Sequence, residues 1–153
     1  MMAIDYEVRA EALFREGYNC AQAVFLAFAL EKMDREEATK LASALGGGLA
    51  GMRTVCGTVS GIAMAYGLLR GYAEPGDKQG KAEVYEAVRE MAEEFEKING
   101  SIICRELLGL DKNVKFMPPS DRNSEYYQKR PCPRLCACSA GILARYLENH
   151  PEK

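Results

Sequence analysis

Cysteines are the side chains in this chain that could do chemistry. The 153 residues include six of them, against a single histidine and no tryptophan. The six are Cys20, Cys56, Cys104, Cys132, Cys136 and Cys138. Thiolates are nucleophiles and soft metal ligands, so thiol–disulfide redox chemistry and metal binding are both open to them. The alternative is that each is an inert, small, buried hydrophobic residue.

Four of these cysteines stand where helices are predicted to begin, namely Cys20, Cys56, Cys104 and Cys132. Cys20 directly follows the capping residue Asn19, and Cys132 directly precedes Pro133, a residue type favoured in the first turn of a helix. A helix start carries unpaired N–H groups and a partial positive charge, which favour thiolate over thiol. We therefore expect low thiol pKa values at these positions, suited to nucleophilic attack or to metal ligation.

The segments that carry the cysteines are predicted to be helical almost throughout. Apolar residues recur at helical spacing, and strand-like alternation is nearly absent. The predicted helices cover about 4–16, 19–30, 34–46, 55–69, 79–97, 101–108 and 133–147. The expected fold is all-α, a bundle of about six to seven helices in a single domain, 1–153.

One long segment, about 110–131, shows no helical pattern and is predicted to be an irregular loop. It contains two adjacent prolines, Pro118 and Pro119, and two adjacent tyrosines, Tyr126 and Tyr127. A loop of this length could be a flap over a site. The slightly favoured alternative is an ordinary loop that packs its tyrosines against the bundle.

A run of small residues follows Cys56 in the stretch "CGTVSG". Gly57, Gly61 and Ala65 recur every four residues, so one face of that helix is nearly bare. Gly57, Ser60 and Gly61 are accordingly predicted to contact a cofactor beside Cys56. Close packing of another helix, or a homodimer contact, would also use such a face.

Glycines precede Cys56 as well, in "GGGLAGMRTV". Gly46, Gly47, Gly48 and Gly51 can adopt positive φ, which would let the backbone approach a bound group. The stretch lacks the lysine and the Ser or Thr that end a phosphate-binding loop. We therefore expect no nucleotide phosphate there.

Four motifs in order resemble the small family of redox-active proteins named after its cysteine pattern, C_GCAxxG_C_C. The matching pieces are "GYNCAQAV", "CGTVSG", "NGSIICRELLG" and "RPCPRLCACSAGILARYL", which together span almost the whole chain. One departure is Thr58, where the family has alanine. The resemblance implies a redox role for Cys20, Cys56, Cys104 and Cys132. It does not supply a reaction.

Cys136 and Cys138 lie outside that pattern. Cys136 falls one helical turn after Cys132, on nearly the same face, so it could be a resolving thiol or a substitute ligand. Cys138 points elsewhere on the helix and is expected to be a packing or surface residue. Arg105 and Glu106, which follow Cys104, are expected to form part of a solvated face.

We expect the four cysteines to bind an iron–sulfur cluster, with [2Fe–2S] favoured, because such clusters use all-cysteine ligation and electron transfer needs no other catalytic side chain. Against this expectation, the four are 28 to 48 positions apart, without the close pairs of ferredoxin-type sites. Folding would have to bring them together.

Two alternatives stay open. In the first, Cys20 or Cys56 attacks a disulfide or an oxidant without any metal, and a second cysteine resolves the product. In the second, the four sulfurs hold a structural zinc ion and the protein is a scaffold or binding module.

The net charge and the hydropathy of the chain limit the kinds of partner that can be expected. The net charge is −2, so nucleic acid is not expected as a partner. The N-terminal residues carry acidic side chains early and do not resemble a signal peptide, and no apolar run is long enough to span a membrane. We expect a cytoplasmic protein with a separate redox partner that the sequence does not identify.

Overall fold

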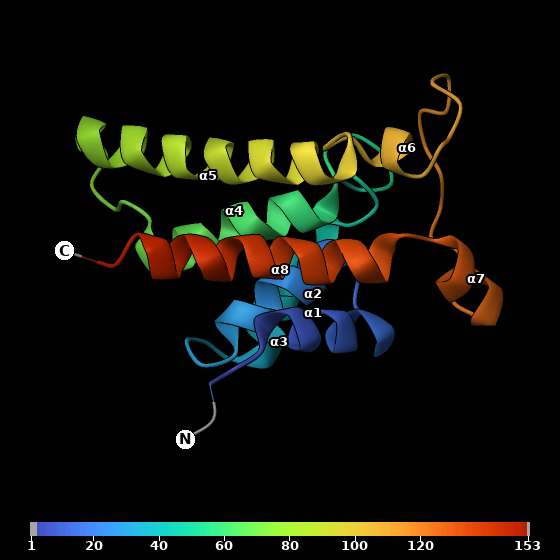
Figure 1. Ribbon diagram of the computed structural model, residues 1–153, viewed down its shortest axis with the longest axis horizontal. Helices are drawn as coiled ribbons and strands as arrows, with labels where there is room; N and C mark the ends of the chain where they lie inside the picture. The colour runs from blue at the N-terminus through green and yellow to red at the C-terminus, as the bar shows by residue number, and fades with distance from the viewer. Residues whose placement is uncertain (1–2, 153) are drawn as a thin grey trace.

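The computed structural model describes residues 3–152, and it confirms the all-α fold. Within those residues the chain forms eight α-helices and one 3₁₀ turn (Figure 1). They are α1 (Tyr6–Arg15), α2 (Cys20–Ala29), α3 (Arg35–Ala42), η1 (Ser43–Leu45), α4 (Gly57–Arg70), α5 (Lys78–Asn99), α6 (Cys104–Leu107), α7 (Ser124–Lys129) and α8 (Cys132–Asn149).

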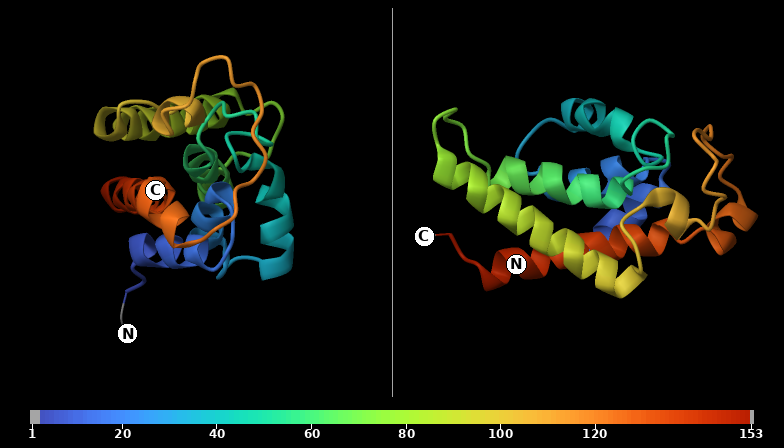
Figure 2. Two further views of the ribbon diagram at one scale, coloured as in Figure 1. Left: turned by 90° about the vertical axis from the view of Figure 1, so that its right-hand side faces the viewer. Right: turned by 90° about the horizontal axis from the view of Figure 1, so that it is seen from above.

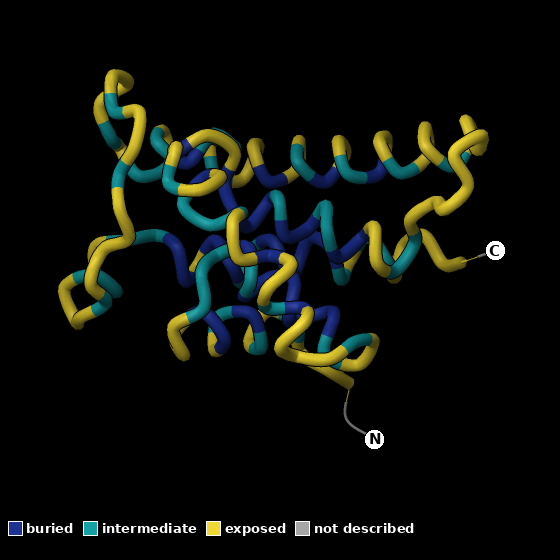
Figure 3. Tube along the Cα trace, turned by 180° about the vertical axis from the view of Figure 1, so that it is seen from behind, coloured by how far each residue is buried: buried dark blue, intermediate teal, exposed yellow. Residues whose placement is uncertain are grey.

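Helix α2 forms the centre of the core. Its sequence, CAQAVFLAFA, is apolar on every face, and almost all of it is buried. α1, α3, α4 and α8 pack around it, with α4 making the most extensive contact. The buried parts of the trace lie toward the middle of the bundle (Figure 3). Because α2 is surrounded, its first residue, Cys20, is held in a fixed place.

The small-residue face of α4 is covered by α2 of the same chain. A Cβ atom added to Gly61 would lie 2.8 Å from Cβ of Val24, so only glycine permits this approach. The face predicted to serve either a core or a dimer therefore serves the core.

Helix α5 lies across α4 and α8 as an outer layer, visible along the upper edge of Figure 1 and from above in Figure 2. Ala87, Met91 and Phe95 are its buried residues, and charged residues cover its outer side. It ends at Gly100, which adopts φ +91°, and this turn leads the chain back toward the start of α4.

Capping residues set several helix starts as the sequence predicts. Asn19 accepts a hydrogen bond from the backbone N–H of Gln22 at 2.8 Å, and Gln22 accepts from the N–H of Asn19 at 3.0 Å. Asp34 likewise accepts from the N–H of Glu37 at 3.1 Å. The capping box that immediately precedes Cys20 is thus confirmed.

Two predictions about elements were wrong. The third helix ends at Ala42 rather than near Gly46, because the chain tightens into the 3₁₀ turn η1. The segment 110–131 contains a short helix, α7, which starts where Asn123 accepts a hydrogen bond from the N–H of Tyr126 at 2.9 Å. A helix of six residues is too short to show a helical period in the sequence.

None of the helices in residues 3–152 is both long and apolar enough to cross a lipid bilayer.

Candidate functional site

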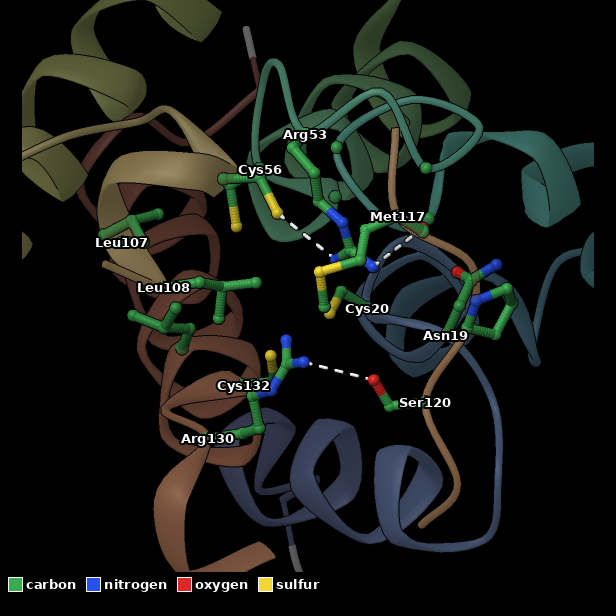
Figure 4. A pocket seen from close by; sticks show the side chains of 18 of the residues that line it. Asn19, Cys20, Arg53, Cys56, Leu107, Leu108, Met117, Ser120, Arg130 and Cys132 are labelled. Atoms are coloured by element: carbon green, nitrogen blue, oxygen red, sulfur yellow. Dashed lines mark hydrogen bonds between the residues drawn. The ribbon is translucent and has the colours of Figure 1, made fainter. Parts of the chain in front are cut away.

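The starts of four helices meet at one cavity of about 270 Å³ (Figure 4). Cys20, Cys104 and Cys132 are the first residues of α2, α6 and α8, and Cys56 immediately precedes α4. All four line the cavity. The structure therefore brings together the four cysteines that the sequence singles out, although they are far apart along the chain.

An isolated antiparallel bridge between Val55 and Ile103 joins two of these helix starts. The N–H of Cys56 donates to the carbonyl of Ile102 at 2.7 Å, and the N–H of Cys104 donates to the carbonyl of Thr54 at 2.6 Å. Since Cys56 and Cys104 flank the bridged residues, both lie on the same side of the bridge. Backbone hydrogen bonds thus hold this pair on one wall of the cavity.

Cys20 and Cys132 form the second pair. Each lies close enough to shift the pKa of the other, and Cys136, on the next turn of α8, also shifts the pKa of Cys20. Gly57 makes room for this pair, because an added Cβ would lie 3.1 Å from Cβ of Cys20. Of the four cavity cysteines only Cys20 is more than slightly exposed.

The pKa values of the four thiols are raised, so the expectation of low pKa values at helix starts was wrong. Burial raises the pKa of Cys56 to about 11 and also raises that of Cys104. Hydrogen bonding to the Cys20 thiol, followed by burial, raises the pKa of Cys132. The pKa of Cys20 is raised as well: its hydrogen bond with Cys132 acts the other way, but the contact with Cys136 and burial outweigh it. Burial of the thiols and repulsion between neighbouring thiolates raise the pKa values by more than the positive helix starts lower them.

The glycine-rich stretch before Cys56 forms a left-handed turn beside the cavity. Five consecutive residues, 47–51, have φ between +51° and +79°, and Arg53 has φ +58°. At Gly48 an added Cβ would lie 2.6 Å from Cβ of Cys104, so this wall must be bare backbone. The prediction of positive φ holds for three of the four glycines. Gly46 instead has φ −73°, and an added Cβ there would meet the Asn19 side chain.

Arg53 is a site residue that the sequence reasoning did not identify. Its side chain lies in the cavity wall and is only 7% exposed. Nη1 donates to Sγ of Cys104 at 3.7 Å, and Nη2 donates to the carbonyl of Met117 at 3.2 Å (Figure 4). A lone arginine inside a glycine-rich, otherwise apolar stretch was the signal that could have pointed to it.

Arg105 is partly exposed and Glu106 is exposed, as expected, but Arg105 also holds the strained loop in place. Its side chain donates to the carbonyls of Met52 at 3.0 Å, Arg53 at 3.3 Å and Lys112 at 3.1 Å. Arg105 therefore connects α6 to two successive carbonyls of the loop before α4 and to one carbonyl of the segment after α6.

The segment 110–131 closes the cavity on the remaining side. Met117, Ser120 and Arg130 line it, as labelled in Figure 4. Tyr126 and Tyr127 also pack against Phe14, with ring centroids 6.4 and 6.3 Å away. The two predictions for this segment, a flap over a site and a loop that packs its tyrosines, are thus compatible. The tyrosines pack against the bundle, and other residues of the segment cover the cavity.

Arg122 fastens this segment to the bundle. It donates to the backbone carbonyls of Phe14 and of Tyr18, the latter at 2.7 Å, and its guanidinium lies 3.9 Å from the centre of the Phe14 ring. These contacts join the segment to the end of α1 and the turn that leads into α2.

Most of the remaining predicted site residues lie apart from the cavity surface. Gly57 lines the cavity, whereas Ser60 and Gly61 do not, because the next turn of α4 faces α2. Cys136 is fully buried behind Cys20. Cys138 lies against α5, where the side-chain amide of Asn99 is 3.5 Å from its sulfur, which agrees with a packing role.

The chemistry of the donor set fits a sulfur-ligated group, but the arrangement is not that of a single metal ion. In residues 3–152 no three His, Cys, Asp or Glu side chains converge on one ion position. The four sulfurs surround the cavity as two pairs, one from α4 and α6 and the other from α2 and α8. A cofactor with two metal ions, such as a [2Fe–2S] cluster, is held by a separate pair of ligands on each ion.

Comparison with known proteins gives one match. The family model described as "Putative redox-active protein (C_GCAxxG_C_C)" matches residues 18–146, which include all six cysteines. Searches of curated proteins and of solved structures return no match to this chain.

Proposed function

The chain belongs to the C_GCAxxG_C_C family of redox-active proteins, and we propose that it transfers electrons through a [2Fe–2S] cluster held by Cys20, Cys56, Cys104 and Cys132. Family membership supports the redox role. The nature of the redox group is our inference from the cavity.

The observation that carries the proposal is the pairing of the four cysteines around one cavity. A [2Fe–2S] cluster takes two cysteine sulfurs on each of its two irons. Cys56 and Cys104 are held together by the backbone bridge, and Cys20 and Cys132 are held together at the starts of α2 and α8. The raised pKa values mean that metal binding must displace protons from the thiols, so cluster binding is expected to strengthen as the pH rises.

When bound, such a cluster takes up and releases single electrons at a potential that hydrogen bonds to its sulfurs and solvent exposure set. Arg53 supplies one such hydrogen bond, to the sulfur of Cys104. Burial of Cys56, Cys104 and Cys132, together with the covering segment 110–131, limits the access of water to the sulfurs.

The test is the content of iron and acid-labile sulfide, with a visible absorption spectrum, on protein purified without oxygen. We expect about two irons and two sulfides per chain and a brown colour that fades in air. Replacing Cys104 by serine should lower the iron content, whereas replacing Cys138 by serine should not. A colourless preparation without iron would contradict the proposal.

Metal-free thiol–disulfide exchange is a second candidate, favoured by the placement of Cys20 and Cys132 at two helix starts on one cavity, where each shifts the pKa of the other. In that reaction the two thiols lose two protons and two electrons to a disulfide or another oxidant and form one S–S bond. The raised pKa values weaken this candidate, because thiol–disulfide exchange requires a thiolate. A structural zinc ion is less well supported, since it needs four ligands around one point.

A further inference from the structure

The cavity carries positive charge that the sulfur chemistry does not require. Its lining includes Arg53, Arg122 and Arg130, while no Asp or Glu from the described part of the chain lines it. Asn19, Ser43, Ser120 and Tyr126 add neutral polar groups. The rest of the lining is the four cysteines, apolar side chains and the backbone of the glycine-rich turn. Such a lining is suited to an anion.

Arg53 is the strongest indication. With 93% of its surface removed from solvent, its guanidinium has a carbonyl and a sulfur as acceptors, and Nε has no partner within residues 3–152. A buried guanidinium without a carboxylate partner is costly, because no protein counter-ion balances its charge. The backbone also holds it at φ +58°, an unfavourable value for arginine.

Arg130 approaches the same space from the start of α8. It donates to Oγ of Ser120 at 3.1 Å, and its guanidinium lies 5.4 Å from the centre of the Tyr126 ring. Figure 4 shows the guanidinium groups of Arg53 and Arg130 turned into the cavity from different walls. Arg130 lines the same cavity as Cys104 and Cys132, and its positive charge acts to lower the pKa of each.

Arg122 has a different role. Its guanidinium is occupied by two backbone carbonyls and by the Phe14 ring. Two arginines, Arg53 and Arg130, therefore remain to bind an anion.

We propose that Arg53 and Arg130 bind a small oxyanion, a carboxylate or a sulfur oxyanion, next to the four cysteines. Guanidinium groups bind such oxygens with two parallel hydrogen bonds. A cavity of about 270 Å³ falls below the usual size of drug-sized ligand pockets, so the ligand is a small one. The binding of this anion beside the cysteines does not depend on the proposed cluster.

The experiment is calorimetric titration of the full chain, purified without oxygen, with sodium sulfate and separately with sodium acetate, at constant ionic strength in chloride. Iron and sulfide are measured on the same sample. We expect saturable binding of at least one of the two ions, and whichever ion binds more tightly identifies the oxyanion class.

Arg53→Gln and Arg130→Gln should each weaken binding about tenfold or more, the effect of losing a charged hydrogen-bonding partner. The matched control is Arg89→Gln, an exposed arginine on α5, which should bind as the unchanged protein does. Arg53→Lys keeps the charge and should retain part of the binding, which separates loss of the anion site from misfolding.

Absence of saturable binding, or equal binding by Arg53→Gln and the unchanged protein, would overturn the proposal. A second result would also overturn the proposal: Arg53→Gln loses iron and the unchanged protein binds no anion. Arg53 would then serve to balance the negative charge of the cysteine thiolates. Anion binding by a preparation that contains no iron would support this site while contradicting the cluster.

Discussion

At the scale of single residues, Cys56 links its own ionisation to the stability of the fold. Its pKa is raised from an ordinary 9.0 to about 11, so the folded state keeps the proton at pH values where the unfolded chain has lost it. The contribution to stability is fully present below pH 9 and is lost as the pH rises to about 11.

We therefore expect the free energy of unfolding of the reduced, metal-free protein to fall between pH 9 and pH 11. Cys56 alone should account for about 3 kcal/mol of this decrease. Urea unfolding at a series of pH values measures it. Cys56→Ser removes the titrating group, so its pH profile should be flatter by this amount. Parallel profiles for the two proteins would show that Cys56 ionises normally.

Gly57 is a second residue whose role can be tested. Its Cα lies so close to α2 that a methyl group would meet the backbone nitrogen of Ala21 and the carbonyl of Leu45, each at 3.1 Å. Gly57→Ala should destabilise the fold by about 1–3 kcal/mol and displace Cys20, since backbone atoms cannot easily move aside. Thermal unfolding and the iron content of the variant measure the two effects.

The comparison for Gly57 is Gly67→Ala on the same helix, where an added Cβ meets no atom within 4 Å. That change should be neutral or slightly stabilising, because alanine favours the helix more than glycine does. Equal effects at the two positions would mean that the contact between α2 and α4 is looser than described.

At the scale of elements, the left-handed turn 47–51 carries strain next to the cavity. Ala50 has φ +51°, a region in which residues with a Cβ are disfavoured by roughly 1–2 kcal/mol. Its side chain is exposed, so little packing is lost when it is removed.

Ala50→Gly should therefore raise the free energy of unfolding by about 1 kcal/mol. The matched control, Ala82→Gly at an exposed position of α5, should lower it by about 0.5–1 kcal/mol, because glycine is unfavourable within a helix. Urea unfolding of the two variants separates these signs. A decrease for Ala50→Gly would indicate that the turn does not adopt the left-handed conformation in solution.

At the scale of the whole molecule, Arg122 determines how firmly the segment 110–131 covers the cysteines. Arg122→Gln removes its hydrogen bonds to the carbonyls of Phe14 and Tyr18. We expect iodoacetamide to alkylate Cys20 and Cys132 several-fold faster in this variant, because a looser segment exposes the thiols more often. Mass spectrometry of the modified peptides measures the rates.

Lys129→Gln is the control for this effect. Lys129 lies on the same segment, but its amine pairs with the exposed carboxylate of Glu125. Its removal should leave the alkylation rates unchanged, since exposed pairs contribute little. Faster alkylation in both variants would show a general loosening of the segment, not a role of Arg122.

Much of this molecule could be predicted from its sequence because its signals are local. Helical periodicity, the Asn19 capping box and the cysteines beside predicted helix starts depend on residues within one or two turns. The raised thiol pKa values could not be predicted, because burial and neighbouring thiols arise only when distant segments meet. Arg53 and Arg105 were missed for the same reason, since their partners lie about 50 or more positions away or across a strained turn.

The contribution of one cysteine from each of four distant helix starts also bears on how the site is made during synthesis. A growing chain on the ribosome contains Cys20, Cys56 and Cys104 well before Cys132. The second pair is complete only when the start of α8 has been translated and has docked against α2. Early segments thus cannot capture metal as a compact pair of neighbouring cysteines would. We therefore expect loading of the proposed cluster to be a late step that follows folding.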